Sequence, residues 1–324
     1  MRMRSPWFPL AAVVAMAIVA GAPAQAETYP SKPVKIVMAT AAGSAPDVIA
    51  RIVTDRLAQV WGKQVLILNR PGAGGLLAAQ AVVSAEPDGY TLYLPSASSL
   101  VVLPETQKLP FDLGKDVVPI GIIGTQPFVI AVVPALGVNT LAELIALAKK
   151  RPGEIMYAGN FRGSLPNLTG ELFRSRAGID LTFVPYAGSA QAFQDVLAGR
   201  VPVVVEGLAA LVGAVQTGVL KALAVTSLQR LANMPDVPTV AETIPGFEAN
   251  GWFTLMAPAG TPAAIVRQAS DDLRAVLAKP EVRERFETLG TYARPASAAD
   301  TAAFIRGEQE LWRPFVRQVG APAQ

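Results

Sequence analysis

The side chains most often used in catalysis and metal binding are absent from this sequence. Its 324 residues include no histidine and no cysteine. A Ser-His-Asp triad, a Cys-His dyad, an imidazole or thiolate metal site and a disulfide are therefore all excluded. The chain also has no Gly-x-Ser-x-Gly elbow and no Ser-x-x-Lys motif, so the common serine mechanisms lack their signatures.

Pairs of carboxylates do occur, at Asp271 with Asp272 and at Glu281 with Glu284. Glycoside hydrolysis would need two such groups converging in a cleft, whereas these pairs fall in charged helical stretches and are more simply solvated helix surface. No titratable group has an identifiable activating partner. We therefore expect a binding protein without catalytic residues, cofactor or metal, and an exported α/β enzyme is the less favoured alternative.

A loop of small residues follows the first expected strand and leads into a helix. In open parallel sheets, ligands bind beyond the carboxyl ends of strands, where helix N-termini offer free N–H groups. The candidate ligand-binding residues here are Thr40, Ala41, Ala42, Gly43 and Ser44, followed by Asp47 in the first helical turn. A tight strand-to-helix connection explains the loop about equally well, and Asp47 also suits the helix dipole.

A second loop of this kind carries the one cation of the expected cleft loops. Its candidate residues are Asn160, Arg162, Gly163 and Ser164. The Arg162 guanidinium can clamp a carboxylate through charge-assisted hydrogen bonds. The alternative is an arginine that faces solvent.

Five further candidates also lie at or beyond strand ends: Ser96, Tyr186, Gly188, Ser189 and Glu206. Tyr186 could line a pocket or cap the core. Glu206 ends a very apolar strand, where a carboxylate is costly to bury unless it is paired or bonded to amides. It orients a ligand or, as we favour, caps the next helix.

The stretch from Arg70 to Gly75 resembles a phosphate-binding loop, but it lacks the Gly-Lys-Ser/Thr ending and the full Gly-x-Gly-x-x-Gly pattern. We interpret it as a turn into a helix.

Short strand-like runs alternate with helical ones, which is typical of parallel sheets with right-handed crossovers. The sequence predicts two doubly wound, mainly parallel α/β lobes, with the C-terminal helices packing back on the first lobe. Five prolines in residues 233–262 predict a rigid, irregular crossing segment rather than a central strand. We expect strands at 34–39, 65–69, 90–94, 155–158, 181–184, 201–206 and 220–226, and helices at 47–61, 74–85, 140–151, 166–177, 190–198 and after Pro262.

The first 26 residues are typical of a secretory signal. Arg2 and Arg4 precede an apolar stretch from Leu10 to Ala20, and Ala24-Gln25-Ala26 forms a small-residue cleavage site. A membrane anchor is the alternative, but the apolar stretch is well short of the roughly 20 residues that span a bilayer. We expect a soluble periplasmic protein that begins at Glu27.

Composition indicates a folded, nearly neutral protein. Hydrophobic residues make up 51% and charged residues 16% of the chain, against about 25% charged in an average soluble domain. Cleavage removes two of 28 basic residues and none of 25 acidic ones, which leaves a net charge of +1. Without a basic run, the sequence gives no support for nucleic-acid binding.

Several short motifs, in order and spacing over nearly the whole mature chain, resemble the substrate-binding proteins of tripartite tricarboxylate transporters, also called the Bordetella uptake gene product family. They are Tyr29-Pro30-Ser31-Lys32-Pro33-Val34, Asn69-Arg70-Pro71-Gly72-Ala73-Gly74-Gly75, Pro87-Asp88-Gly89-Tyr90, Gly170-Glu171-Leu172-Phe173, Val184-Pro185-Tyr186, Gly188-Ser189, Leu223-Ala224-Val225-Thr226-Ser227, Pro235-Asp236-Val237-Pro238 and Ala257-Pro258-Ala259-Gly260-Thr261-Pro262.

The resemblance implies a two-lobed periplasmic binding protein of the Venus-flytrap type that closes on a small carboxylate through backbone amides and ordered waters. It also implies delivery to the permease subunits of a membrane transporter, a monomer, and two interlobe crossings. We expect the first lobe to comprise 27–128 and 252–324, and the second 129–251. A ligand-sensing subunit for a membrane histidine kinase is the alternative.

Two cleft loops depart from the family pattern. Ala39 to Ser44 replaces a loop that usually reads Pro-Phe-Ala-Pro-Gly-Gly, and Phe161 and Arg162 stand where small polar residues are usual. Thr40 in place of the aromatic residue predicts a wider pocket on the first-lobe side.

Overall fold

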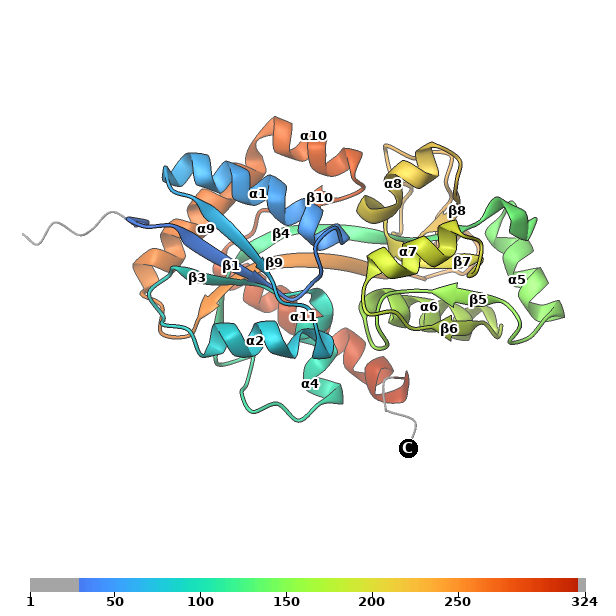
Figure 1. The fold of residues 1–324 in the computed structure, drawn as a ribbon, viewed down its shortest axis with the longest axis horizontal. Helices are drawn as coiled ribbons and strands as arrows, with labels where there is room; N and C mark the ends of the chain where they lie inside the picture. The colour runs from blue at the N-terminus through green and yellow to red at the C-terminus, as the bar shows by residue number, and fades with distance from the viewer. Residues whose placement is uncertain (1–28, 320–324) are drawn as a thin grey trace, which may run out of the picture.

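The protein is a two-lobed α/β molecule, as the sequence predicts. The computed structural model describes residues 29–319. Its strands form one sheet in the order β2-β1-β3-β9-β4-β7-β5-β6, while β8 and β10 pair with β4 outside this path. The sheet runs through both lobes, with β1 to β3 at one end and β5 to β8 at the other (Figure 1).

The first lobe is built on three parallel strands, in which β1 (Val34–Met38) lies between β2 (Val65–Asn69) and β3 (Thr91–Leu94). The C-terminal helices pack on this lobe, where the indole N–H of Trp61 donates to Asp272 at 2.8 Å. The lobe's helices are α1 (Ala45–Trp61), the 3₁₀ turn η1 (Ala73–Gly75), α2 (Leu76–Val83), α3 (Ala97–Val101), α4 (Leu103–Thr106), α9 (Ala263–Ala278), α10 (Pro280–Thr288) and α11 (Ala298–Val319).

The second lobe repeats the arrangement, with β5 (Met156–Ala158) between β6 (Thr182–Val184) and β7 (Val203–Gly207). β8 (Lys221–Val225) runs antiparallel to β4. The lobe's helices are α5 (Leu141–Lys150), α6 (Leu165–Ala177), α7 (Ser189–Leu197) and α8 (Leu208–Gln216), with the 3₁₀ turns η2 (Pro134–Leu136) and η3 (Val240–Glu242).

Two long antiparallel strands join the lobes, β4 (Val117–Val132) and β9 (Asn250–Pro258). The expectation of an irregular segment over residues 233–262 is therefore wrong for its last part, where β9 is a buried central strand. The prolines explain the difference, because they fall before β9, at its last residue or after it, and leave residues 250–257 free of proline.

Glycine lets other backbone approach β4 closely. A Cβ atom on Gly124 would lie 2.7 Å from the carbonyl oxygen of Tyr292, in the strand β10 (Tyr292–Ala293) that pairs with β4 here. A residue that reads as a strand breaker therefore permits this pairing.

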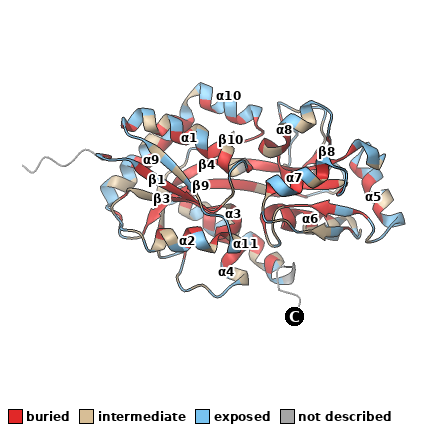
Figure 2. Cartoon of the chain, viewed as in Figure 1, coloured by how far each residue is buried: buried red, intermediate tan, exposed pale blue. Residues whose placement is uncertain are grey.

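Buried residues line both faces of the sheet (Figure 2). In the first lobe, Ile36, Ile49 and Leu273 belong to one cluster that packs α1 and α9 on the strands. In the second, Val196, Val204 and Leu211 belong to another, which packs α7 and α8 on β7. Between residues 29 and 319, no helix has both the length and the apolar character required to cross a membrane.

Candidate functional site

A cavity of about 510 Å³ lies between the loops at the facing edges of the two lobes. The first lobe contributes the loops after β1 and β2 together with α3, α4 and the connection between them, and the second lobe contributes the loops after β5 and β6. The wall of this outer cavity is formed by Ala39, Thr40, Ala41, Ser44, Pro71, Gly72, Ala73, Gly74, Ser98, Val102, Leu103, Thr106, Gln107, Asn160, Phe161, Arg162, Gly163, Ala187, Gly188 and Ser189.

A smaller, inner cavity of about 60 Å³ adjoins the outer one, and the two share Thr40, Ser98, Asn160 and Phe161. This volume suits a few waters or one small polar group, since a single water needs roughly 10 to 15 Å³ by this kind of measure. The other residues that line the inner cavity are Pro46, Ala97, Ser96, Gln126, Phe128, Ser164, Leu165, Pro166, Glu206, Gly251, Trp252 and Phe253.

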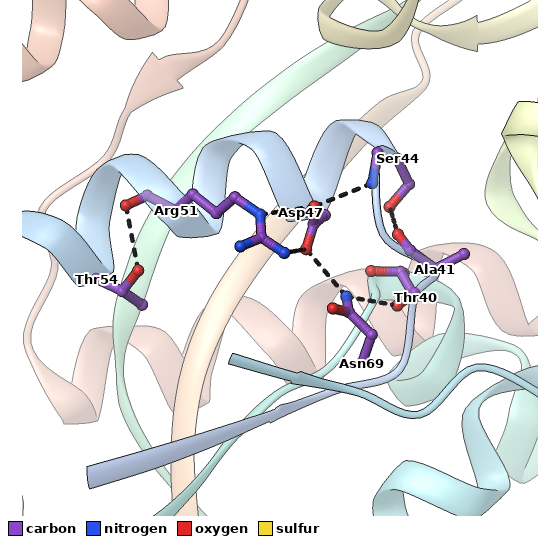
Figure 3. A network of polar contacts seen from close by, with 8 residues as sticks. Thr40, Ala41, Ser44, Asp47, Arg51, Thr54 and Asn69 are labelled. Atoms are coloured by element: carbon purple, nitrogen blue, oxygen red, sulfur yellow. Dashed lines mark hydrogen bonds and ion pairs between the residues drawn. The ribbon is translucent and has the colours of Figure 1, made fainter. Parts of the chain in front are cut away.

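The first-lobe loop is held in shape by the carboxylate of Asp47 (Figure 3). This carboxylate accepts hydrogen bonds from the Gly43 amide at 3.0 Å, from Asn69 Nδ2 at 3.0 Å, and from Arg51 Nε and Nη2 at 3.0 and 3.1 Å. Asn69 Nδ2 also donates to the carbonyl of Thr40 at 3.0 Å. Burial by itself raises the pKa of Asp47, but these hydrogen bonds outweigh it, so the pKa of Asp47 lies below its ordinary value.

The second-lobe loop is held in a similar way by the amide of Asn167. Its Oδ1 accepts from the Gly163 amide at 2.8 Å, and its Nδ2 donates to the Tyr157 hydroxyl at 3.0 Å. That hydroxyl in turn donates to Glu171 at 2.5 Å. The hydroxyl of Ser164, the N-cap residue of α6, accepts a hydrogen bond from the backbone N–H of Asn167 at 3.3 Å. The helix α6 therefore begins at the cavity with a side-chain cap.

A third polar cluster lies where the loops after β5 and β6 meet β7. Asn160 Nδ2 donates to Ser189 Oγ at 3.2 Å, and Ser189 Oγ donates to Glu206 Oε2 at 2.6 Å. The backbone N–H of Gly207, the N-cap residue of α8, donates to Glu206 Oε1 at 2.8 Å, but no side chain among residues 29–319 caps the first turn of α8. Burial raises the pKa of Glu206, and the bonds from Ser189 and Gly207 only partly oppose that shift.

Most of the candidate residues from the sequence lie in the cavity walls. The outer wall includes Thr40, Ala41, Ser44, Asn160, Arg162, Gly163, Gly188 and Ser189, and the inner wall includes Thr40, Ser96, Asn160, Ser164 and Glu206.

Four candidates lie outside both walls. Ala42 is an exposed loop residue. Gly43 and Asp47 bond to each other behind the loop, so their part is support. The Tyr186 hydroxyl donates to Asp195 at 2.8 Å, which turns it toward α7. The position of a residue in a loop does not reveal which way its polar group points, and no local pattern in the sequence separates these four from the rest.

Sequence reasoning missed the contribution of the loop after β2. Pro71, Gly72, Ala73 and Gly74 line the outer cavity, although this stretch does form a turn into α2, as expected. The signal was available, because β2 is parallel to β1 and its carboxyl end must lie at the same edge of the sheet. The residues of α4 that line the cavity carried no such signal.

Arg162 lies at the rim of the outer cavity. Its side chain is exposed, and its guanidinium carbon lies 5.4 Å from the centre of the Phe183 ring. Among the residues lining either cavity, it is the one with a positive charge. Within residues 29–319, no group of three acidic side chains is arranged to hold a metal ion.

A family model described as the tripartite tricarboxylate transporter family receptor matches residues 49–321. The chain belongs to this receptor family. It is 38% identical to a UPF0065 protein of Bordetella bronchiseptica over 91% of this chain and 88% of that protein. It is 36% identical to BugT of Bordetella pertussis over 93% of each.

Solved structures of similar proteins share this fold. Rpa4515 of R. palustris with adipate superposes with a TM-score of 0.87 at 30% identity, covering 90% of this chain and 98% of that one. The periplasmic binding protein BugD gives 0.85 at 31% identity, covering 90% and 99%. MatC of Rhodopseudomonas palustris with bound malate gives 0.82 at 29% identity, covering 89% and 100%.

Membership of this receptor family makes the protein a solute-binding protein of the periplasmic type. The expected signal sequence, residues 1–26, lies outside the residues that the structure describes.

Proposed function

We propose that this protein binds a small carboxylate in the cavity between its lobes and delivers it to a tripartite tricarboxylate-type transporter. The observation that carries the proposal is the cavity wall itself, where preshaped loops from both lobes meet. The Gly43 turn is fastened by Asp47 and the Gly163 turn by Asn167. Ordering these loops in advance lowers the entropy cost of binding.

The helix ends favour an anion. The residues Ser44, Ser164 and Gly188 are the N-caps of α1, α6 and α7, and each lies in a cavity wall. Helix N-termini combine free N–H groups with the positive end of the helix dipole. Two of these helix ends, at Ser44 and Gly188, lie at the outer cavity and one, at Ser164, lies at the inner cavity. Together they support a carboxylate as the ligand group.

The structural neighbours support the same class of ligand. Two of them were solved with adipate and with malate, both small dicarboxylates. We assign the ligand of this chain to the same class and its contacts to the candidate residues that line the walls. The outer cavity of about 510 Å³ has the size of a small-molecule site.

Delivery requires that the permease distinguishes the loaded receptor from the empty one. We propose that residues 27–128 with 252–324 move against residues 129–251, bending where β4 and β9 pass between the lobes. A ligand that touches loops of both lobes binds the closed state more tightly and shifts the population toward it.

A thermal-shift screen of the exported, processed protein against mono-, di- and tricarboxylates tests the binding step. A ligand that binds only the folded state at 100 times its Kd adds about 2.7 kcal/mol to the free energy of unfolding. At least one carboxylate should raise Tm, and calorimetry should give one site per chain. A complete screen without a shift would overturn the proposal.

Small-angle scattering and co-purification test delivery. The scattering radius should fall when the ligand binds, and the loaded monomer should co-purify with the permease subunits. An unchanged radius with a ligand that binds would exclude closure, and capture by a sensor kinase alone would point to signalling instead.

A further inference from the structure

Glu206 is a buried carboxylate with no cation beside it in the described part of the chain. It is 7% exposed, lines the inner cavity, and accepts hydrogen bonds only from the Ser189 hydroxyl and the Gly207 amide among residues 29–319. A buried charge without a cation is costly, and the bond from the Gly207 N–H does not require one, because a neutral oxygen could accept that bond equally well.

The directions of the hydrogen bonds around Glu206 are fixed by backbone groups. The Phe161 amide donates to Asn160 Oδ1 at 3.0 Å, so Asn160 turns its Nδ2 toward Ser189. Ser189 Oγ accepts that bond and donates its own hydrogen to Glu206. While Glu206 is ionised, Ser189 can therefore accept a hydrogen bond from a ligand but has no hydrogen to give.

Protonation of Glu206 reverses this direction. A proton on Oε2 donates to Ser189 Oγ, and the Ser189 hydrogen becomes free to point toward the outer cavity, whose wall includes Ser189, while Glu206 itself lines the inner one. Oε1 still accepts from the Gly207 N–H, so this bond is kept. One proton thus converts Ser189 from an acceptor into a donor toward the ligand.

Within residues 29–319, no charge on the elements packed against Glu206 compensates it. β4 and α8 carry no titratable side chain. The titratable groups on β5, α6 and α7 bond elsewhere: Tyr157 to Glu171, Glu171 to Arg174, Arg174 to Asp180, Arg176 to the Pro245 carbonyl, and Asp195 to Tyr186 and Arg200. The exposed Arg162 lines the outer cavity only.

We propose, building on the function proposed above, that Glu206 makes the inner end of the cavity selective for a neutral hydrogen-bonding group such as a hydroxyl. A second carboxylate enters there only together with one proton, which Glu206 takes up. Two carboxylates in so small a space would otherwise repel each other with no cation between them. The raised pKa of Glu206 has the direction that this requires.

Calorimetry with paired ligands tests this role. Succinate and adipate are compared with 4-hydroxybutyrate and 6-hydroxyhexanoate, which replace one carboxylate by a hydroxyl. Each pair is titrated from about pH 6.5 to 9, where free carboxylates stay ionised, in two buffers of different ionisation enthalpy. Above the pKa of Glu206, dicarboxylate affinity should fall about tenfold per pH unit with uptake of one proton, while hydroxy-acid affinity stays constant.

Two variants separate a specificity role from a purely structural one. Glu206→Gln presents an amide that still accepts from Gly207 and donates to Ser189, as the protonated acid does. At any pH above the pKa of Glu206, it should bind dicarboxylates more tightly than wild type and without proton uptake. Glu308→Gln is the control. Glu308 is a half-buried carboxyl with a raised pKa that lines neither cavity but accepts from the indole N–H of Trp252, an inner-wall residue, at 2.9 Å. Glutamine can still accept that bond, so this variant should keep the wild-type pH profile.

Dicarboxylate binding that is independent of pH, or proton uptake that persists in Glu206→Gln, would overturn the role of Glu206 while leaving carboxylate binding intact. If no carboxylate bound to the wild type or to either variant, the proposed function would be overturned, and this inference with it.

Discussion

The two loops that face each other across the cavity share one backbone design and differ in charge. Residues 43–47 read Gly-Ser-Ala-Pro-Asp, and residues 163–167 read Gly-Ser-Leu-Pro-Asn. Gly43 and Gly163 have φ values of +78° and +81°, and each donates its N–H to the residue four positions later. The Asp47 carboxylate also accepts from the Arg51 guanidinium, whereas the Asn167 side chain donates to the Tyr157 hydroxyl.

The shared part shows what the loop requires, which is a glycine in the left-handed region and an oxygen acceptor in the first helical turn. The acceptor residue itself, Asp47 or Asn167, differs because the side chains around it differ between the lobes. An exposed arginine lies beside Asp47 and can neutralise a charge, while Asn167 is buried against a hydroxyl that needs a donor.

The residues before each glycine differ more. Thr40-Ala41-Ala42 on the first lobe corresponds to Asn160-Phe161-Arg162 on the second. The first-lobe loop therefore presents mainly backbone and small side chains to the cavity, and the second-lobe loop presents an amide, a ring and a cation. We expect ligand specificity to depend more on the second of these loops than on the first.

The largest effect is expected from Asn167→Asp. The new carboxylate cannot donate to Tyr157 and adds a negative charge close to Glu171, so the free energy of unfolding should fall by about 3 kcal/mol or more. The new group should have a raised pKa, so the loss is smallest at low pH and grows as pH rises through that pKa. Urea unfolding at acidic and neutral pH measures this. Adding Glu171→Gln should restore part of the stability, because Tyr157 can then donate to the new carboxylate.

The reverse change, Asp47→Asn, should cost less, about 2 kcal/mol, because the charge lost is partly solvated through Arg51. The pKa of Asp47 is depressed, so its contribution is present at neutral pH and is lost as pH falls through that pKa. The variant should therefore match wild type in strong acid and differ above it. Asp55→Asn, on the exposed side of the same helix, is the control and should change stability by no more than about 0.5 kcal/mol.

Arg162→Ala makes the second loop more like the first and should act on binding rather than folding. Because the side chain is exposed, we expect dicarboxylate affinity to fall about tenfold, with stability changed by less than about 0.5 kcal/mol. Arg162→Lys should recover only part of the loss, since an ammonium lacks the planar fork. Calorimetry measures the affinity of both variants. If both bind the dicarboxylate as tightly as wild type does, the Arg162 side chain faces solvent and does not contact the ligand.

The smallest effect is expected from Thr40→Val. Thr40 Oγ1 is buried and has no hydrogen-bond partner among the described residues. Its removal should leave stability unchanged or raise it by up to about 1 kcal/mol, and should weaken by a few fold any ligand that bonds this hydroxyl. Thr54→Val is the control, because the buried Thr54 hydroxyl donates to the Arg51 carbonyl at 3.1 Å and its loss should be mildly destabilising. A clear loss of stability in Thr40→Val would contradict the prediction.

Local patterns in the sequence predicted most elements of both lobes, including β2 to the residue and α1, α5 and α6 to within a few residues. They failed for β4 and β9. These two strands pair through residues more than 100 positions apart. Both also contain glycine and proline, which argue locally against a central strand. Strand pairing over such distances leaves no local signature.

The candidate site was predicted to the level of loops but not of side chains. Strand ends placed Thr40, Asn160 and Ser189 in the walls, since parallel strands share one edge. Whether Asp47 faces the cavity or the loop behind it depends on Asn69 and Arg51, which reach it from another strand and another helical turn. Such partnerships appear only in three dimensions.

The position of β9 also determines the order in which the chain can fold as it emerges. β9 lies between β3 and β4 in the sheet, yet it is separated from β4 by the whole second lobe. The first-lobe sheet therefore remains divided until residue 250 has emerged, whereas the second-lobe strands β5 to β8 are already available. Pulse-labelled hydrogen exchange on chains arrested before and after residue 250 has emerged should find amides of the second lobe protected before those of β1 and β3, and the opposite order would contradict this sequence of events.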